Sequence, residues 1–142
     1  MKPLNFCWLD EFLAGSSYPS SIRNIDYFIE NGITNIITLT MELPIVSKYT
    51  KSITFHHIPV SVEPSEEQIN LFLKIIETIR NKGEKAVVHC QYGQERTGIF
   101  LVHYFMKFID KNLDIAFKEV RKGRLSCLQN SNSKHHLVNY YT

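Results

Sequence analysis

The sequence predicts an α/β fold, a single domain with a central, mostly parallel sheet of about four or five strands and helices on both faces. Short runs of residues that favour strands alternate with amphipathic segments of helix length. The connections between successive strands are long enough to hold the crossover helix that parallel strands require. A chain of 142 residues, 44% hydrophobic and 21% charged, has the size and composition of one globular domain. We therefore expect residues 1–142 to form one domain with one site.

The N-terminal segments predict a small strand pair and a helix. Residues 6–14 contain two short apolar pieces around Asp10, which favours two short strands. A helix is expected next, because Ser20 or Ser21 can cap its start and Gly32 can end it. Its apolar face is expected to contain the residues at helical spacing, Ile22, Ile25, Phe28 and Ile29.

Two strands and the best-marked helix follow. Residues 33–39 are rich in Ile and Thr and predict a strand, and residues 52–58 predict another after a turn near Pro44. Ser65 and Gln68 form a capping-box pattern that begins a helix, which Gly83 ends. The buried face of this helix is expected to contain Ile69, Phe72, Ile76 and Ile79.

The second half of the chain is expected to hold the site. Residues 86–89 predict a short buried strand, and residues 97–109 a helix that is apolar on most faces and therefore buried. Amphipathic segments at 113–122 and 132–141 predict two more helices. Ligands of such sheets bind at the carboxyl ends of the strands. The loop between residues 89 and 96 is therefore the expected binding site.

The residues of this loop favour an anionic ligand. A loop that folds tightly before a helix points its N–H groups into one concavity, where the helix dipole adds positive charge. A phosphoryl group is the natural ligand of such a cradle. The residues expected to surround it are Gln91, Tyr92, Gly93, Gln94, Glu95 and Arg96.

Three side chains of the loop carry the expected chemistry. Cys90 opens the cradle, and converging N–H dipoles favour the thiolate form of a cysteine, which makes Cys90 the candidate nucleophile. Arg96 can reach back over the loop and bind two phosphoryl oxygens with its planar guanidinium. The hydroxyl of Thr97 is expected to donate to the Cys90 sulfur.

Three further residues are expected to shape the loop. His89 precedes the nucleophile on the strand, so its ring is expected to point away from the cradle and to hold the loop by hydrogen bonds. Gly93 supplies the backbone freedom of a turn. Gly98 is expected to let the helix approach the sheet closely.

The pattern H-C-x-x-G-x-x-R-T-G, at residues 89–98, resembles the signature of the cysteine-based protein tyrosine phosphatases. The short chain is similar to the small, atypical members of the dual-specificity branch. This resemblance extends over nearly the whole chain, through Asn5, Phe6 and Trp8, residues 13–15, Leu39, Thr40 and Glu42, Ile58 and Pro59, and Pro64, Gln68 and Ile69. It implies a phosphocysteine intermediate, with Cys90 as nucleophile and Arg96 on the phosphate, and neither a cofactor nor a metal.

The resemblance also implies a general acid. At the position of this acid, the sequence departs from the family pattern. Members of the family carry an aspartate on the loop after the Ile-Pro pair, whereas Val60 and Val62 occupy both positions where it could align. Glu63 is the nearest replacement, and our hypothesis is that it is the acid. The next acidic residues, Glu66 and Glu67, are expected to belong to the first helical turn.

A polar residue that orients the attacking water in relatives is expected near Gln129 in this chain. A surface glutamine in a loop is the alternative interpretation of that position. A basic cluster at Arg121, Lys122 and Arg124 either complements a helix dipole or borders the cleft.

The function expected is hydrolysis of phosphotyrosine on proteins, with phosphoserine and phosphothreonine as further candidates. One alternative is a non-protein phosphate, such as a phosphoinositide or an RNA 5′-triphosphate. The cradle loop contains no lysine, which disfavours such highly charged substrates. The other alternative is a pseudophosphatase that binds phosphate without turnover, an interpretation that rests on Val60 and Val62.

Composition limits the remaining possibilities. The net charge of +2 argues against a dedicated nucleic-acid binder, and the apolar stretch 99–106 is too short to cross a membrane. Asp10 and Glu11 interrupt any signal-peptide core, and three cysteines suit a reducing compartment. We therefore expect a cytoplasmic monomer with access to the nucleus, whose partner is a phosphorylated protein rather than a nucleic acid or a membrane. The histidines without zinc-site spacing are expected to be structural or solvated, namely His56, His57, His103, His135 and His136.

Overall fold

The computed structural model describes residues 1–122 and 127–142. Its elements in chain order are β1 (Cys7–Trp8), β2 (Leu13–Ser16), α1 (Ile22–Glu30), β3 (Ile33–Thr38), the short 3₁₀ helix η1 (Ile45–Lys48), β4 (Thr54–His57), α2 (Glu66–Asn81), β5 (Lys85–His89), α3 (Glu95–Phe108), α4 (Leu113–Arg121) and α5 (Ser131–Tyr140). The strand order is β1-β2-β5-β3-β4. β1 is antiparallel to β2, and the β2–β5, β5–β3 and β3–β4 pairs are parallel. The α/β fold class and the mostly parallel sheet are confirmed.

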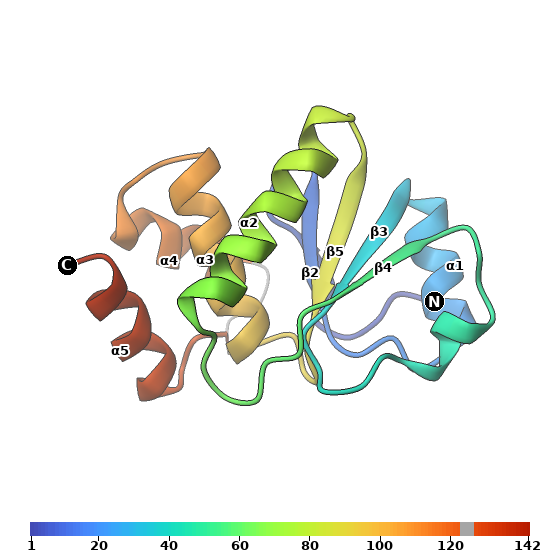
Figure 1. The fold of residues 1–142 in the computed structure, drawn as a ribbon, viewed down its shortest axis with the longest axis horizontal. Coiled ribbons are helices and arrows are strands. Elements are labelled where there is room, and N and C mark those ends of the chain that lie inside the picture. The colour runs from blue at the N-terminus through green and yellow to red at the C-terminus, as the bar shows by residue number, and fades with distance from the viewer. Residues whose placement is uncertain (123–126) are drawn as a thin grey trace.

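The two faces of the sheet are covered unequally. Alternate residues of the strands point to opposite faces, so Ile36 and Ile37 of β3 lie in different hydrophobic clusters. Ile36 packs with Phe28 of α1. Ile37 belongs to the larger cluster, which contains Phe72 of α2 and Phe100 of α3. Figure 1 shows α1 on one side of the sheet and α2 to α5 on the other. The predicted helices on both faces are confirmed.

The capping box of α2 also holds the preceding loop. The Gln68 N–H donates to Ser65 Oγ at 3.1 Å, and the Ser65 N–H donates to Gln68 Oε1 at 3.0 Å. The amide nitrogen of Gln68 donates to the Pro59 carbonyl at 2.7 Å. The predicted start of this helix is therefore confirmed, and its cap fixes the beginning of the loop that carries Glu63.

Two details of the helices differ from the prediction. In α1, Ile22 and Ile29 are exposed, whereas Asn24 is buried and accepts from the Ser20 N–H. The expected four-residue apolar face is therefore narrower, because the chain before the helix needs a polar group there. The predicted start of α3 at residue 97 is also late, since the helix begins at Glu95.

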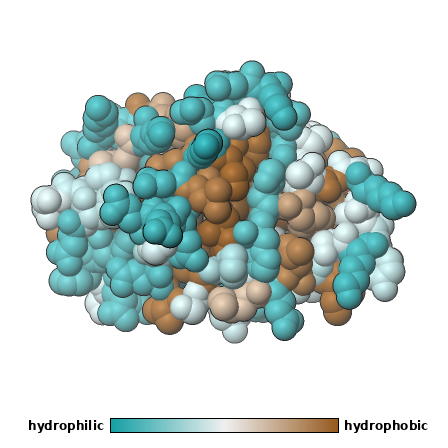
Figure 2. Space-filling model, in the orientation of Figure 1, coloured by the Kyte–Doolittle hydropathy of each residue, from teal (hydrophilic) through white to brown (hydrophobic). Residues whose placement is uncertain are grey.

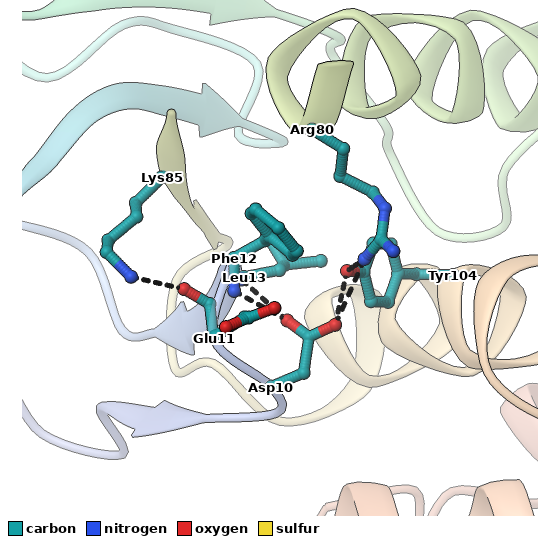
Figure 3. Close-up of polar contacts among 7 residues, drawn as sticks. All are labelled: Asp10, Glu11, Phe12, Leu13, Arg80, Lys85 and Tyr104. Atoms are coloured by element: carbon teal, nitrogen blue, oxygen red, sulfur yellow. Dashed lines mark hydrogen bonds and ion pairs between the residues drawn. The ribbon is translucent and has the colours of Figure 1, made fainter. Parts of the chain in front are cut away.

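A polar cluster joins the β1–β2 hairpin to two helices. Figure 3 shows the Asp10 carboxylate pointing toward both Arg80 of α2 and Tyr104 of α3. One Asp10 carboxylate oxygen accepts from Arg80 at 3.2 Å and from the Tyr104 hydroxyl at 2.5 Å. The other accepts from the N–H groups of Phe12 and Leu13. Burial, followed by the hydrogen bond to Asp10, raises the pKa of Tyr104, so its hydroxyl remains a donor.

The surface of the face in Figure 2 is mostly hydrophilic. A strip of hydrophobic residues runs through its centre, where Figure 1 shows α2 beside β4. Exposed Leu71 and partly buried Ile75 belong to α2. Within the described ranges, every helix falls short of the length and apolar character that a bilayer span requires.

Candidate active site

The loop after β5 turns its carbonyl groups outward. Donors elsewhere in the molecule bind three of these carbonyls: Leu39 N–H to His89 O at 2.9 Å, Tyr18 N–H to Gln91 O at 3.0 Å, and Asn5 Nδ2 to Tyr92 O at 2.7 Å. The Gln94 carbonyl accepts from the Gly98 N–H at 3.1 Å as part of the first turn of α3. In the part of the chain that the structure describes, the N–H groups of Gln91, Tyr92 and Gly93 donate to no protein group. Buried or clustered N–H groups normally have acceptors. Successive unpaired N–H groups before a helix form an anion-binding concavity.

Gly93 is required by the shape of this loop. Its φ of +75° lies in the left-handed region. A Cβ atom there would lie 2.6 Å from the backbone carbonyl carbon and oxygen of Ser16. The backbone freedom predicted for Gly93 is therefore used, and the absence of a side chain also lets the loop pack against the end of β2.

The ring of His89 holds the loop by two hydrogen bonds. Burial, the largest influence, lowers the pKa of His89 to about 4, so the ring is neutral at pH 7. Its Nδ1 lies 3.1 Å from the Cys90 carbonyl, which can only accept, so the proton is on Nδ1. Its Nε2 therefore accepts from the Thr38 hydroxyl at 2.8 Å. The hydrogen bonds expected of His89 are present.

Cys90 and Arg96 lie where the sequence pattern places them, at the two ends of the loop. Cys90 directly follows β5 and is buried, and Arg96 lies in the first turn of α3. One guanidinium nitrogen of Arg96 donates to the Val60 carbonyl at 2.9 Å. This bond fixes the guanidinium against the loop that follows β4.

The expected hydrogen bond from Thr97 to the Cys90 sulfur is not formed. The Thr97 hydroxyl is fully buried and contacts no hydrogen-bond partner among the described residues. The prediction was wrong for this state of the molecule. A buried hydroxyl without a hydrogen-bond partner costs stability.

The structure of the loop after β4 distinguishes the two valines at which the expected aspartate could align. Val60 is 1% exposed and belongs to the core, and its N–H donates to the Leu39 carbonyl. Val62 is 69% exposed and lines a pocket of about 180 Å³ together with Glu63 and Arg96. An acid could therefore face the pocket from position 62, but not from position 60. Glu63, the adjacent residue, is the acidic side chain of this loop that lines the pocket.

Glu63 is bound to a histidine that the sequence left without a role. Its Oε1 lies 2.7 Å from Nδ1 of His136, which is on α5. The Glu63 side chain is 59% exposed and that of His136 is 7% exposed. Because 73 residues separate the two, no local pattern could have predicted this pair.

Glu95 connects the loop to the segment before α5. Its two carboxylate oxygens accept from the N–H groups of Gln129 and Asn130 at 3.1 and 3.0 Å. The Glu95 side chain therefore has a structural role, and the predicted binding of substrate by Glu95 stays a prediction. The bonds place Gln129 next to the start of α3, and the predicted role of its side chain in orienting water stays a prediction.

The comparisons with known proteins identify the family. The model of the "Dual specificity phosphatase, catalytic domain" family matches residues 16–142. The chain belongs to the dual-specificity phosphatase family. Its match begins at the end of β2 and includes the whole cradle loop and α5.

Several relatives of this dual-specificity phosphatase chain are known. It is 31% identical over 110 residues to tyrosine-protein phosphatase cdc-14 of Caenorhabditis elegans. This alignment covers 75% of the chain and 15% of the relative. It is 26% identical over 120 residues to human dual specificity protein phosphatase 7, covering 82% of the chain and 29% of the relative. The chain therefore spans less than a third of the length of these two relatives.

A solved structure is similar over its full length. The crystal structure of Tk-PTP in the active form superimposes with a TM-score of 0.83 at 25% identity. The superposition covers 99% of this chain and 98% of the other. The dual-specificity phosphatase fold is thus present from the β1–β2 hairpin to α5.

Gly98 has a role in this phosphatase fold that differs from the prediction. A Cβ atom at Gly98 would lie 2.5 Å from Cys127 Sγ and 2.9 Å from a methyl carbon of Leu128. The close approach is therefore to the segment before α5 and not to the sheet. Cys127 is buried and its Sγ donates to the Gln94 carbonyl at 2.9 Å, so this segment also supports the cradle loop.

Two other predictions concern residues near this segment. Arg121 donates to the carbonyls of Cys127 and Leu128 at 3.2 and 2.7 Å, which holds the segment rather than the cleft. Arg124, of the same basic cluster, lies outside the described residues. Outside positions 123–126, no three His, Cys, Asp or Glu side chains gather as a metal site would require.

Proposed function

We propose that this chain is a metal-independent, cysteine-dependent phosphatase that hydrolyses phosphotyrosine on proteins, with phosphoserine and phosphothreonine as further substrates to test. The observation that carries the proposal is the cradle loop. Donors from other segments bind its carbonyls at His89, Gln91 and Tyr92, and its N–H groups at Gln91, Tyr92 and Gly93 have no acceptor among the described residues. Cys90 begins this loop and Arg96 ends it. This arrangement suits a phosphoryl group held against a sulfur nucleophile.

The proposed reaction has two steps. In the first, Cys90 Sγ attacks phosphorus, the bond to the leaving oxygen breaks, and Glu63 gives that oxygen its proton. In the second, water attacks the phosphocysteine, Glu63 takes a proton from the water, and the sulfur–phosphorus bond breaks. Arg96 binds equatorial oxygens in both steps. Gln129 is the candidate for orienting the water.

The first test is turnover of 4-nitrophenyl phosphate. The wild-type chain is expected to hydrolyse it in the presence of EDTA and to be inhibited by vanadate, and Cys90→Ser is expected to abolish activity. Activity that survives Cys90→Ser would overturn the nucleophile assignment. A wild-type chain that binds vanadate but shows no turnover would instead support the phosphate-binding pseudophosphatase.

The second test identifies the substrate class. Phosphotyrosine, phosphoserine and phosphothreonine peptides are compared with phosphoinositides and an RNA 5′-triphosphate by their kcat/KM. The proposal predicts the highest value for the phosphotyrosine peptide, because the loop lacks lysines and offers Gln91, Tyr92 and Gln94. A higher value for an inositide or the triphosphate would favour the non-protein alternative.

A further inference from the structure

A chain of hydrogen-bonded side chains leads from Glu63 into the interior. Glu63 Oε1 lies 2.7 Å from Nδ1 of His136. Nε2 of His136 lies 3.2 Å from Nε2 of His103 on α3, and Nδ1 of His103 lies 2.5 Å from the Tyr141 hydroxyl. Both ring nitrogens of each histidine are therefore engaged. The Glu63 carboxyl ends this chain at the surface, and both histidines are buried.

The inner part of this chain is neutral at pH 7. Burial, followed by the proximity of His136, lowers the pKa of His103 to about 3, so its ring carries a single proton. Burial, followed by the proximity of Tyr140, raises the pKa of Tyr141, so its hydroxyl keeps its proton. A neutral imidazole has one donor and one acceptor nitrogen. The His103 ring must consequently donate on one side and accept on the other.

Two proton arrangements satisfy every bond of the chain. In one, Tyr141 donates to His103, His103 donates to His136, and Nδ1–H of His136 donates to a Glu63 carboxylate. In the other, the same directions hold, and Nδ1–H of His136 donates to Oε1 of a protonated Glu63 whose proton is on Oε2 and can pass to the leaving oxygen. The same contact therefore accommodates both the acid and the carboxylate form of Glu63 without an unpaired group.

The contact also fixes Glu63 in the pocket that it lines with Arg96. The preceding part of the loop is held at the Pro59 carbonyl by Gln68 and at the Val60 carbonyl by Arg96. The link to His136 fixes the loop again at Glu63, which lines the pocket of about 180 Å³ with Arg96. A mostly exposed glutamate would otherwise sample many rotamers, at a cost in side-chain entropy when it is ordered.

We propose that His136 is a positioning residue for the proton donor, holding Glu63 beside the Arg96 pocket in both of its protonation states, with its own ring oriented by His103 and Tyr141. This inference rests on the proposed function, in which Glu63 supplies a proton to the leaving oxygen and later removes one from water. His136 itself exchanges no proton with the substrate. In the proposed reaction, the Glu63 carboxyl is the group that exchanges protons with the reacting atoms.

Leaving-group dependence tests this role. His136→Gln and Glu63→Gln are assayed on 4-nitrophenyl phosphate, whose leaving group needs little protonation, and on phenyl phosphate, whose leaving group needs more. His136→Gln is expected to lower kcat on phenyl phosphate about tenfold and on 4-nitrophenyl phosphate less than threefold, with KM unchanged. The double variant is expected to lose no more than Glu63→Gln alone, because both substitutions disable one unit.

Two further variants separate positioning from folding. The amide of Asn can present either its nitrogen or its oxygen near the place of Nδ1, so His136→Asn is expected to recover at least half of the kcat that His136→Gln loses. His135→Gln is the matched control, since His135 is the exposed neighbour on α5 and contacts Asn139. Its kcat on both substrates is expected to equal that of the wild type. Thermal unfolding of each variant confirms that the assayed protein is folded.

The outcomes distinguish this inference from the proposed function. Equal losses on both substrates in His136→Gln, or no recovery in folded His136→Asn, would overturn the positioning role. A selective loss in Glu63→Gln with none in His136→Gln would overturn it while leaving Glu63 as the acid. Full activity of Glu63→Gln on phenyl phosphate would remove the acid assignment and this inference together. Failure of the proposed function would be detected separately, because activity that survives Cys90→Ser would show that Cys90 is not the nucleophile.

Discussion

At the scale of single residues, the site depends on histidines that stay neutral. His89 donates from Nδ1 to the carbonyl of the nucleophile and accepts from Thr38, an arrangement that only one neutral tautomer permits. A proton on Nε2 would remove that acceptor and place a charge in a fully buried site near Arg96. The loop geometry and the protonation of His89 are therefore linked.

This linkage predicts an acid-sensitive stability. Because the folded pKa of His89 is about 4 and an unfolded histidine titrates near 6.5, the unfolded chain binds more protons between these values. The free energy of unfolding should therefore be fully retained above about pH 6.5 and fall as the pH drops toward 4, by about 3 kcal/mol from this residue. Urea unfolding at a series of pH values measures it. The free energy of unfolding of His89→Gln should decline less steeply with falling pH than that of His135→Gln. Equal slopes for the two variants would contradict the lowered pKa of His89 in the folded state.

At the scale of elements, the start of α3 is held by the segment before α5. Gly98 lies against Cys127 and Leu128, Cys127 binds the Gln94 carbonyl, and Glu95 binds the N–H groups that follow. The helix whose first turn carries Arg96 is thus fixed by a distant part of the chain. The position of Arg96 depends on this packing as well as on the loop.

Gly98→Ala tests this packing. Alanine ordinarily stabilises a helix by about 1 kcal/mol relative to glycine. Here a Cβ atom would lie 2.5 Å from Cys127 Sγ, and such overpacking costs about 1–3 kcal/mol. The substitution should therefore destabilise the protein rather than stabilise it. We expect lower stability and a lower kcat in Gly98→Ala, measured by urea unfolding and 4-nitrophenyl phosphate turnover. Adding Cys127→Ala, which removes the sulfur, should restore part of both, whereas an unchanged or stabilised single variant would contradict the argument.

The elements themselves could be predicted, and their partners could not. Ser65 with Gln68 marked a helix start, and the pattern from His89 to Gly98 marked an anion site, because both depend on residues close in sequence. The contact of Gly98 with Cys127 and that of Glu63 with His136 join segments far apart in the chain. These side chains come together only when the loop after β4, α3 and the C-terminal segment have folded against one another.

At the scale of the whole molecule, the residues that join the layers and the residues of the candidate site lie at opposite ends of the strands. The cradle loop follows the carboxyl end of β5, whereas Asp10 precedes the amino end of β2, which runs parallel to β5. Asp10 joins the hairpin to α2 and α3 through Arg80 and Tyr104 (Figure 3). A change at Asp10 should therefore affect the assembly of the layers more than the chemistry.

Asp10→Ala is expected to lower the free energy of unfolding by about 2 kcal/mol, since it leaves Arg80 and Tyr104 without their shared acceptor in a partly buried site. For a chain of this size that corresponds to a fall of roughly 4–8 °C in Tm. The kcat of the folded protein at 20 °C should stay within twofold of the wild type. Asp26→Ala, at an exposed position of α1, is the control and should change Tm by less than about 2 °C. A large loss of kcat in folded Asp10→Ala would show that this end of the sheet is coupled to the site, because the substituted group is separated from the cradle by the length of the strands.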